Sequence, residues 1–395
     1  MNSKLLKKIK ITIVIIISLV VVAAAYVGYI YFSYTRIDDN QELDTKMAGA
    51  FSYFEGKEPL KIGEFYNIVT YNIGFGAYTV DYSFFMDGGQ YSWALSKEGL
   101  EANICEIAGV INRAGADFVL LQEVDVDGTR SYHVDELGLL NQFLKGYYYN
   151  DAVCYDTKFL LYPVWQPHGA NKCEQITYSK APISKGIRWS LPVDQGFSKL
   201  FDLDRCYIKT EIPTVEKENL VIYNVHLSAY SNNAEMKNAQ LDKLFADMES
   251  EYKKGNYVIC GGDFNRDLKR ENKDVDYSWS ADFPVEMLPK GFSLASDIAK
   301  DQNIKHNSCR DANEPYNPDT TFTVTTDGFL VSNNIKVNYY INGDWGYEYS
   351  DHDPVMMQIA LEPKYGKSTT AGVVDLFSEP ITVGQDALSS KEDKR

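Results

Sequence analysis

Short apolar segments that end in a polar side chain recur along this chain, and they restrict its fold more than any other feature. Segments 66–72, 118–123 and 220–226 end in Asn72, Glu123 and His226, and segment 257–261 is followed by Gly262-Asp263. Segments of this length, rich in β-branched and aromatic residues, predict strands. Further strands are predicted at 147–155, 175–179, 206–212, 320–325, 328–332, 335–340 and 355–361. Polar residues at so many strand ends predict a cleft where sheet ends meet.

Two amphipathic helices are predicted between these strands, at 97–113 and 233–253. In the first, Leu100, Ile104 and Ile107 share one face and the opposite face is charged. Each helix should therefore cover a sheet from outside. Many strands with few helices, not in strict alternation, predict an α/β fold of packed sheets flanked by helices.

The N-terminus carries a candidate membrane segment. Four lysines between positions 4 and 10 precede 22 residues without a charge, from Ile11 to Phe32. As a helix this run is about 33 Å long, and a bilayer core is about 30 Å thick. The positive charges before the run predict a cytoplasmic N-terminus and a body outside the cell, at the plasma membrane. A cleaved signal peptide ending near Ala25 is the alternative, but the apolar run continues past it, which favours a retained anchor.

Composition and net charge exclude some classes of protein. The chain is 45% hydrophobic and 24% charged, which is ordinary for a globular protein and excludes a wholly disordered one. Its formal net charge of −16 argues against a general nucleic-acid coat protein. It does not exclude a metal enzyme acting on phosphates, because a bound cation reverses the local sign. Two of the six cysteines read as buried apolar residues, and the pairing of the others stays open: Cys154, Cys173, Cys206 and Cys309.

The polar residues at the strand ends form a chemically coherent set. Asp263-Phe264-Asn265 follows one strand, Asp327 opens another, and Asp351-His352 opens the last. Oxygen ligands without thiolates favour Mg²⁺ or Mn²⁺, and histidines move protons near neutral pH. Together these groups are what phosphoester hydrolysis requires. Each motif alone is more often structural, but coincidence explains the whole set poorly.

With these motifs, Gly-Asp-x-Asn and Ser-Asp-His above all, the chain resembles the endonuclease/exonuclease/phosphatase superfamily over about 300 residues. The resemblance implies a four-layered α/β sandwich of two mostly antiparallel β-sheets flanked by helices, here with an N-terminal transmembrane helix. The chain then divides into a cytoplasmic basic tail (1–10), a transmembrane anchor (11–32), a juxtamembrane stalk (33–60), a catalytic domain (61–362) and a flexible tail (363–395).

The resemblance also implies roles for single residues. The expected ligands of Mg²⁺ or Mn²⁺ are Asn72, Glu123 and Asp351. The expected catalytic residues are His226, Asp263, Asn265, Asp327 and His352, with Asp327 holding His352 protonated. Arg205 and Gln175 are candidates for phosphate binding, although Arg205 reads equally well as part of a surface ion pair. Glu174 is a further candidate, for orienting His226.

Two loops are unusually long. The loop 74–96 holds seven aromatic residues, which either pack over the sheet or form a wall of the cleft or a lip that faces the membrane. The loop 266–319 is polar and has little regular pattern. Long loops in a compact domain are often functional.

These features predict a membrane-anchored extracytoplasmic phosphoester hydrolase. A phosphodiesterase acting on a lipid head group or another surface phosphoester fits the anchor and the acidic body. A cell-surface nuclease acting on DNA or RNA is the alternative, but few basic residues lie near the cleft motifs. A catalytically inactive binding module is disfavoured because every central position is filled. Beyond the substrate and the membrane, no obligate protein partner is expected.

Overall fold

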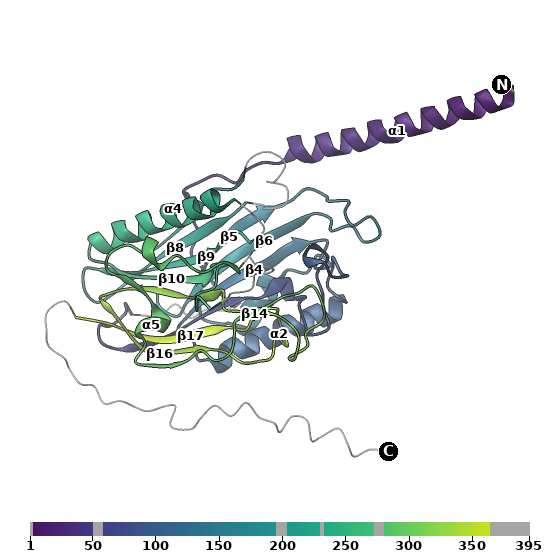
Figure 1. Cartoon of the computed structure of the whole chain (residues 1–395). Coiled ribbons are helices and arrows are strands. Elements are labelled where there is room, and N and C mark those ends of the chain that lie inside the picture. Colours follow the sequence, from purple (N-terminus) through teal and green to yellow (C-terminus); the bar gives the residue numbers. More distant parts are fainter. Residues whose placement is uncertain (1–2, 50–57, 195–203, 230–232, 272–279, 364–395) are drawn as a thin grey trace, which may run out of the picture. The chain divides into compact units, whose positions relative to one another are not determined.

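The computed structural model describes residues 3–49, 58–194, 204–229, 233–271 and 280–363. Within these ranges most strands belong to two large sheets (Figure 1). The first has the order β1-β7-β8-β9-β10-β15-β11, with strands Gln41–Leu43, Lys185–Ser190, Cys206–Pro213, Asn219–His226, Tyr257–Asp263, Asp327–Ser332 and Phe292–Leu294.

The second sheet has the order β12-β16-β17-β3-β4-β6-β5-β2. Its strands are Asp301–Asn303, Ile335–Asn342, Val355–Leu361, Phe65–Asn72, Phe118–Gly128, Asn171–Ser179, Tyr148–Asp156 and Lys46–Met47. Both sheets are mostly antiparallel, with β9 parallel to β10, β3 parallel to β4 and β12 parallel to β16. A short antiparallel pair, β13 (Cys309–Arg310) and β14 (Thr323–Val324), completes the strands.

Apolar side chains of the two sheets meet in a central core layer. Ile68 and Leu120 of one sheet pack in the same buried cluster as Ile222 and Ile259 of the other. Each of these residues is 0% exposed, so the contact between the sheets buries apolar area that stabilises the fold.

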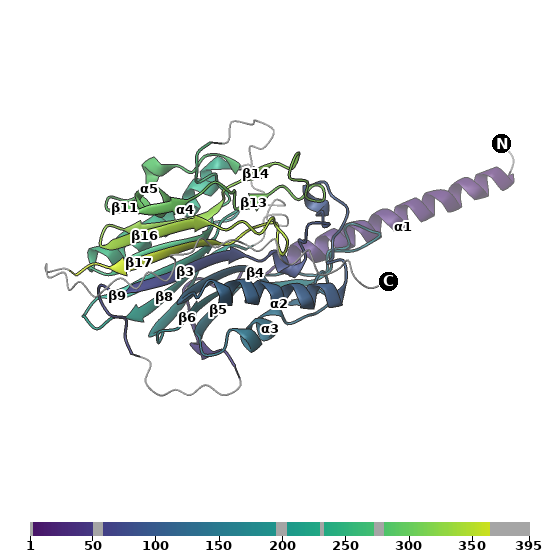
Figure 2. The ribbon, with the colours of Figure 1, turned by 90° about the horizontal axis from the view of Figure 1, so that it is seen from below.

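Helices cover the outer faces of both sheets, as their amphipathic patterns predict. Helix α2 (Lys97–Arg113) places Ile104 in the cluster that holds Val69 and Leu121, and α3 (Glu136–Phe143) lies beside it. Helix α4 (Ala234–Lys253) places Leu244 against Val258. Figures 1 and 2 show α4 on one side of the sheets and α2 with α3 on the other. The four-layered sandwich is therefore confirmed, with the short α5 (Ala295–Ile298) near β11 and β15.

The N-terminal run forms helix α1 (Ser3–Ser33), which is long and apolar enough to cross a membrane. By length and composition alone a signal sequence passes the same test. Part of the segment predicted as a stalk pairs with the body instead, because 41–43 extend one sheet and 46–47 the other. Residues 50–57 of that segment, and the predicted tail apart from Pro363, lie outside the described residues.

Candidate active site

The predicted strand ends come together at one edge of the sandwich. Asp263 at the end of β10 lies opposite His226 of β9 and opposite Asp327 of β15 in the sheet register. In the second sheet Asn72 ends β3 and lies opposite Gln122 of β4. Adjacent strands thus deliver their terminal side chains to a common place, as the apolar runs predict.

A cavity of about 530 Å³ opens at this edge. Seven of the predicted site residues line it: Glu123, Arg205, His226, Asp263, Asn265, Asp351 and His352. Asn72 and Asp327 lie behind this wall and hold the lining residues by hydrogen bonds. The structure does not place Gln175 on the cavity wall, because its side-chain oxygen is 3.6 Å from the Cys206 thiol in the interior.

Glu123 reaches the cavity through an irregularity in β4. The pairing of β4 with β6 shifts register between Leu121 and Val124, and Glu123 has a φ of 56° in the left-handed region. A non-glycine residue pays a conformational cost there, which is common at functional sites. Asn72 Nδ2 donates to Glu123 Oε1 and to Asp263 Oδ2, both at 3.2 Å. Asn72 therefore links the carboxylate of Glu123 in one sheet to that of Asp263 in the other.

Gly262 allows β9 and β10 to approach closely at the site. Its φ is 145°, and a Cβ atom there would lie 1.9 Å from the Val225 carbonyl oxygen. Only glycine fits this position. The glycine that precedes Asp263 is thus a packing requirement of the strand that carries the aspartate.

Asp327 and His352 form a buried charged pair. His352 Nδ1 donates to Asp327 Oδ2 at 2.7 Å, and Ser308 Oγ donates to the same oxygen at 2.7 Å. Burial opposes the charge on the imidazole, but Asp327, with Cys309 and Asp351 nearby, raises the pKa of His352 well above its usual range. His352 is therefore an imidazolium at neutral pH.

His226, in contrast, is a neutral imidazole. Arg205 Nη1 lies 3.1 Å from His226 Nε2, and a guanidinium only donates, so this nitrogen accepts. Burial, the Arg205 charge and the His352 charge hold the pKa of His226 well below its usual range. The cavity thus holds one neutral and one protonated imidazole.

Asp263 lies between the two histidines. Its Oδ2 is 3.5 Å from His226 Nε2 and 3.9 Å from His352 Nε2. Burial and the charge of Asp327 raise the pKa of Asp263 to about 7. Asn265, with a φ of 49°, donates its backbone N–H to Asp263 Oδ1 at 2.9 Å. A carboxyl group with this pKa can exchange a proton near neutral pH.

The residues that could hold a hard cation are Glu123 and Asp351. Both carboxylates line the cavity, and burial together with the Glu123 charge raises the pKa of Asp351. A cation between two such carboxylates would relieve their repulsion, and their oxygens suit Mg²⁺ or Mn²⁺. The chemistry of these two side chains therefore suits the expected metal.

Two other groups of acidic and histidine residues in the described part of the chain could also hold an ion. In the group Asp263, Asp327 and His352, an ion on Nδ1 would displace the hydrogen bond to Asp327. In the group His306, Asp344 and Asp353, none of the three residues lines the cavity.

Ser308 and Arg310 are site residues that the sequence did not predict. Ser308 Oγ accepts the backbone N–H of Thr326 at 3.1 Å and that of Asp327 at 3.0 Å, in addition to its bond to the carboxylate. Arg310 lines the cavity and is 1% exposed, and its Nη atoms donate to backbone carbonyls such as Thr79 O. Both lie in the long loop 266–319, whose length was the only signal.

The aromatic loop 74–96 mainly packs against the body. Phe75, Tyr82 and Phe84 are buried in the core cluster beside α2, which bears out the packing interpretation for them. Tyr78 and the exposed Met86 also line the cavity. The loop is thus both a covering layer and one wall of the cavity.

Glu174 does not lie beside His226. It is 3.8 Å from Lys172 on the same strand, and burial and the Asp151 charge raise its pKa to about 7. The contacts of His226 are instead with Arg205, Asp263 and Glu123.

Comparison with known proteins identifies the same architecture. A sequence model described as the endonuclease/exonuclease/phosphatase family matches residues 69–352. A solved structure of that description from Bacteroides vulgatus is similar at 14% identity and a TM-score of 0.52, covering 76% of this chain and 100% of the other. A mannosyl-6-phosphatase from Bacteroides thetaiotaomicron is similar at 15% identity and a TM-score of 0.51, covering 75% and 100%. A search of curated proteins gave no match.

Proposed function

Because this chain belongs to the endonuclease/exonuclease/phosphatase family, whose members hydrolyse phosphoesters, we propose that it is a metal-dependent phosphoester hydrolase held at the outer face of a membrane. The observation that carries the proposal is the cavity itself. It is lined by His352, Asp263 and His226 together with the carboxylates of Glu123 and Asp351, and Asp327 holds His352 from behind.

Glu123 and Asp351, with Asn72 behind them, would hold Mg²⁺ or Mn²⁺, which neutralises phosphoryl charge when bound. Asp263, with a pKa near neutrality, accepts the proton of the attacking water. Asn265 and Arg205 position the phosphoryl group, and Gln175, although outside the cavity wall, supports this side from the interior.

The two histidines have different roles in the proposed reaction. The His352 imidazolium, fixed by Asp327, stabilises negative charge on the phosphoryl group as it develops. His226 is neutral when the cavity is empty, and an anionic phosphoryl group nearby favours its charged form. It can then pass a proton to the leaving oxygen.

The substrate class we favour is a phosphodiester of a lipid head group. The arginine and lysine side chains that line the cavity in the described part of the chain are Arg205 and Arg310, and the Arg310 Nη atoms donate to backbone carbonyls. A nucleic-acid groove normally has a row of phosphate contacts. Three basic residues follow the Asp263–Asn265 motif in the sequence, Arg266, Lys269 and Arg270. Their side chains donate to Asn238, Asn307 and Asp297 respectively.

A substrate panel tests this choice. The full chain in detergent with Mg²⁺ should hydrolyse sphingomyelin or a phosphoinositide faster than single-stranded DNA, RNA or mannose 6-phosphate. Asp263→Asn is the control for contaminating enzymes. Faster cleavage of DNA or RNA by the wild type alone would replace the lipid substrate with a nuclease activity.

A further inference from the structure

The loop between β5 and β6 presents an unusual row of apolar side chains to solvent. Phe159, Leu161, Tyr162, Val164 and Trp165 are 45, 45, 66, 71 and 77% exposed. Five large apolar residues within seven positions form a patch, and patches of this kind mark contact sites. We call residues 159–165 the apolar loop.

The apolar loop is held in place by its polar flank. Ser92 donates its backbone N–H to Gln166 Oε1 at 3.1 Å, and Trp93 Nε1 donates to Pro167 O at 2.6 Å. Leu160 and Gly169 exchange two backbone hydrogen bonds across the base, at 2.9 and 3.0 Å. The polar groups of the flank therefore turn toward the body while the apolar side chains remain outside.

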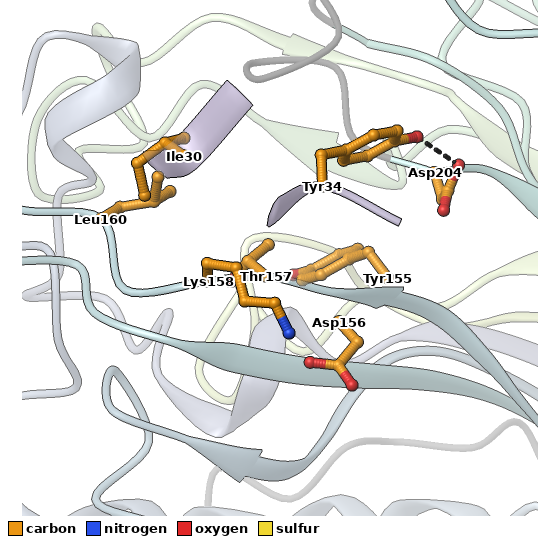
Figure 3. A pocket seen from close by; sticks show the side chains of 8 residues that line it. All are labelled: Ile30, Tyr34, Tyr155, Asp156, Thr157, Lys158, Leu160 and Asp204. Carbon is orange, nitrogen blue, oxygen red and sulfur yellow. Dashed lines mark hydrogen bonds between the residues drawn. The ribbon is translucent and has the colours of Figure 1, made fainter. Parts of the chain in front are cut away.

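The apolar loop contacts the candidate membrane helix directly. Tyr26 of α1 donates its hydroxyl to Phe159 O at 2.9 Å and accepts the Leu161 N–H at 2.6 Å. Ile30, one turn later on the same face, is buried and lines a pocket of about 30 Å³ with Leu160 (Figure 3).

The position of Tyr26 gives the level of this contact. Tyr26 lies six residues, or about 9 Å along a helix, before Phe32, where the apolar run ends. If α1 crosses a bilayer, its contact partner lies near the outer boundary of the hydrocarbon core, next to the interfacial layer where tyrosine and tryptophan are enriched. A row of exposed apolar side chains at that depth faces lipid.

The apolar loop also adjoins the cavity. It follows the end of the second sheet at which Gly128 of β4 pairs with Asn171 of β6. Glu123 lies on β4, five residues before Gly128. The rings of Tyr162 and Phe85 are 5.8 Å apart, and Met86, the next residue, lines the cavity.

We propose that the apolar loop is a second membrane contact, which enters the interfacial layer of the bilayer beside α1 and holds the cavity next to lipid head groups. The apolar loop thus contacts the same lipid bilayer that α1 crosses. This contact rests on the membrane anchoring in the proposed function, and it would favour phosphodiesters presented by the bilayer.

Quenching of tryptophan fluorescence by brominated lipids locates the apolar loop without any enzymatic readout. The full chain in nanodiscs should be quenched by phosphatidylcholine brominated near the glycerol end of the acyl chains, and less by lipid brominated near the chain end. Trp165→Phe should remove most of that quenching. Trp345→Phe is the matched control, because Trp345 is partly buried against the core cluster and its replacement should leave the quenching unchanged.

Quenching that is the same in the wild type and in Trp165→Phe would overturn the proposal. Hydrolysis of a soluble diester by the same nanodisc sample separates this result from failure of the proposed function. As a second readout, Val164→Ser/Trp165→Ser should slow hydrolysis of a bilayer lipid by at least about fivefold and spare the soluble diester. Val215→Ser, a 58% exposed residue in the turn before β9, should change neither.

Discussion

The two imidazoles of the cavity carry different charges because their neighbours differ. His352 has a carboxylate 2.7 Å from Nδ1, whereas His226 has a guanidinium 3.1 Å from Nε2. Burial lowers the pKa of both rings; at His226 the Arg205 charge adds to this effect, whereas at His352 the Asp327 charge outweighs it.

Asp327→Asn tests the charged pair. Asp327 raises the pKa of His352, so activity that needs the imidazolium is present at neutral pH and is lost as pH rises through that raised value. The amide removes this charge, and the alkaline limb of the rate profile should move to lower pH, with turnover at neutral pH about 10²-fold lower. A rate profile measured on a soluble diester checks this. An unchanged limb and rate would remove Asp327 from the mechanism.

Glu123→Gln tests the metal assignment. The side chain keeps its size but loses the charge that we expect to face the cation, so more Mg²⁺ should be needed for half-maximal activity and most activity should be lost at ordinary concentrations. Titration of activity with Mg²⁺ measures this. Asp127→Asn, an exposed aspartate on the same strand, is the matched control and should behave as the wild type. An identical Mg²⁺ curve for both variants would contradict the assignment.

The sequence allowed prediction of those site residues that lie at the ends of apolar strands. His226, Asp263 and Asp327 could be placed because adjacent strands bring their ends together. Ser308 and Arg310 could not, since their loop has no periodic pattern from which a neighbour is predicted. Gln175 follows a strand pattern as well, but its side chain faces the interior between the sheets.

At the level of strands and helices, the long periodic segments were predicted well and the irregular ones were not. Helix α2 and strand β17 have the predicted bounds. Strand β7 was missed because its sequence contains Arg188, which is 1% exposed and donates to Val153 O and Asp38 O. Helix α3 was missed because it is only eight residues long. Propensity alone does not reveal a buried arginine or a short helix that tertiary contacts stabilise.

The two sheets also bring a pair of cysteines together. Cys154 of β5 and Cys206 of β8 are buried with their Sγ atoms 3.5 Å apart. If the body faces an oxidising space, we expect these thiols to lose two protons and two electrons to a small disulfide oxidant and form a disulfide between the sheets.

Mass measurement after alkylation of unreduced, denatured protein checks this pair. Two cysteines should resist alkylation, and the bridge should add about 2–4 kcal/mol to the free energy of unfolding. Cys105→Ser is the control, because Cys105 lies on α2 away from the pair. Six alkylated cysteines in protein taken from the membrane under oxidising conditions would rule the bridge out.

For the whole molecule, labelling on cells tests the proposed topology. The lysines before the apolar run predict that the body lies outside the cell. In Ser390→Cys, a thiol reagent that cannot cross membranes should label the tail on intact cells. Labelling that appears only after lysis would place the body in the cytoplasm.

The proposed function requires that this cavity hydrolyses phosphoesters with a bound cation and with Asp263. Hydrolysis of bis-p-nitrophenyl phosphate by the purified full chain tests it most directly, measured with Mg²⁺, after EDTA and after Mg²⁺ is restored, beside Asp263→Asn. We predict that EDTA abolishes hydrolysis, that Mg²⁺ restores it, and that the variant is at least about 10²-fold slower under all conditions. Hydrolysis that survives EDTA, or that is equal in wild type and Asp263→Asn, would contradict the account.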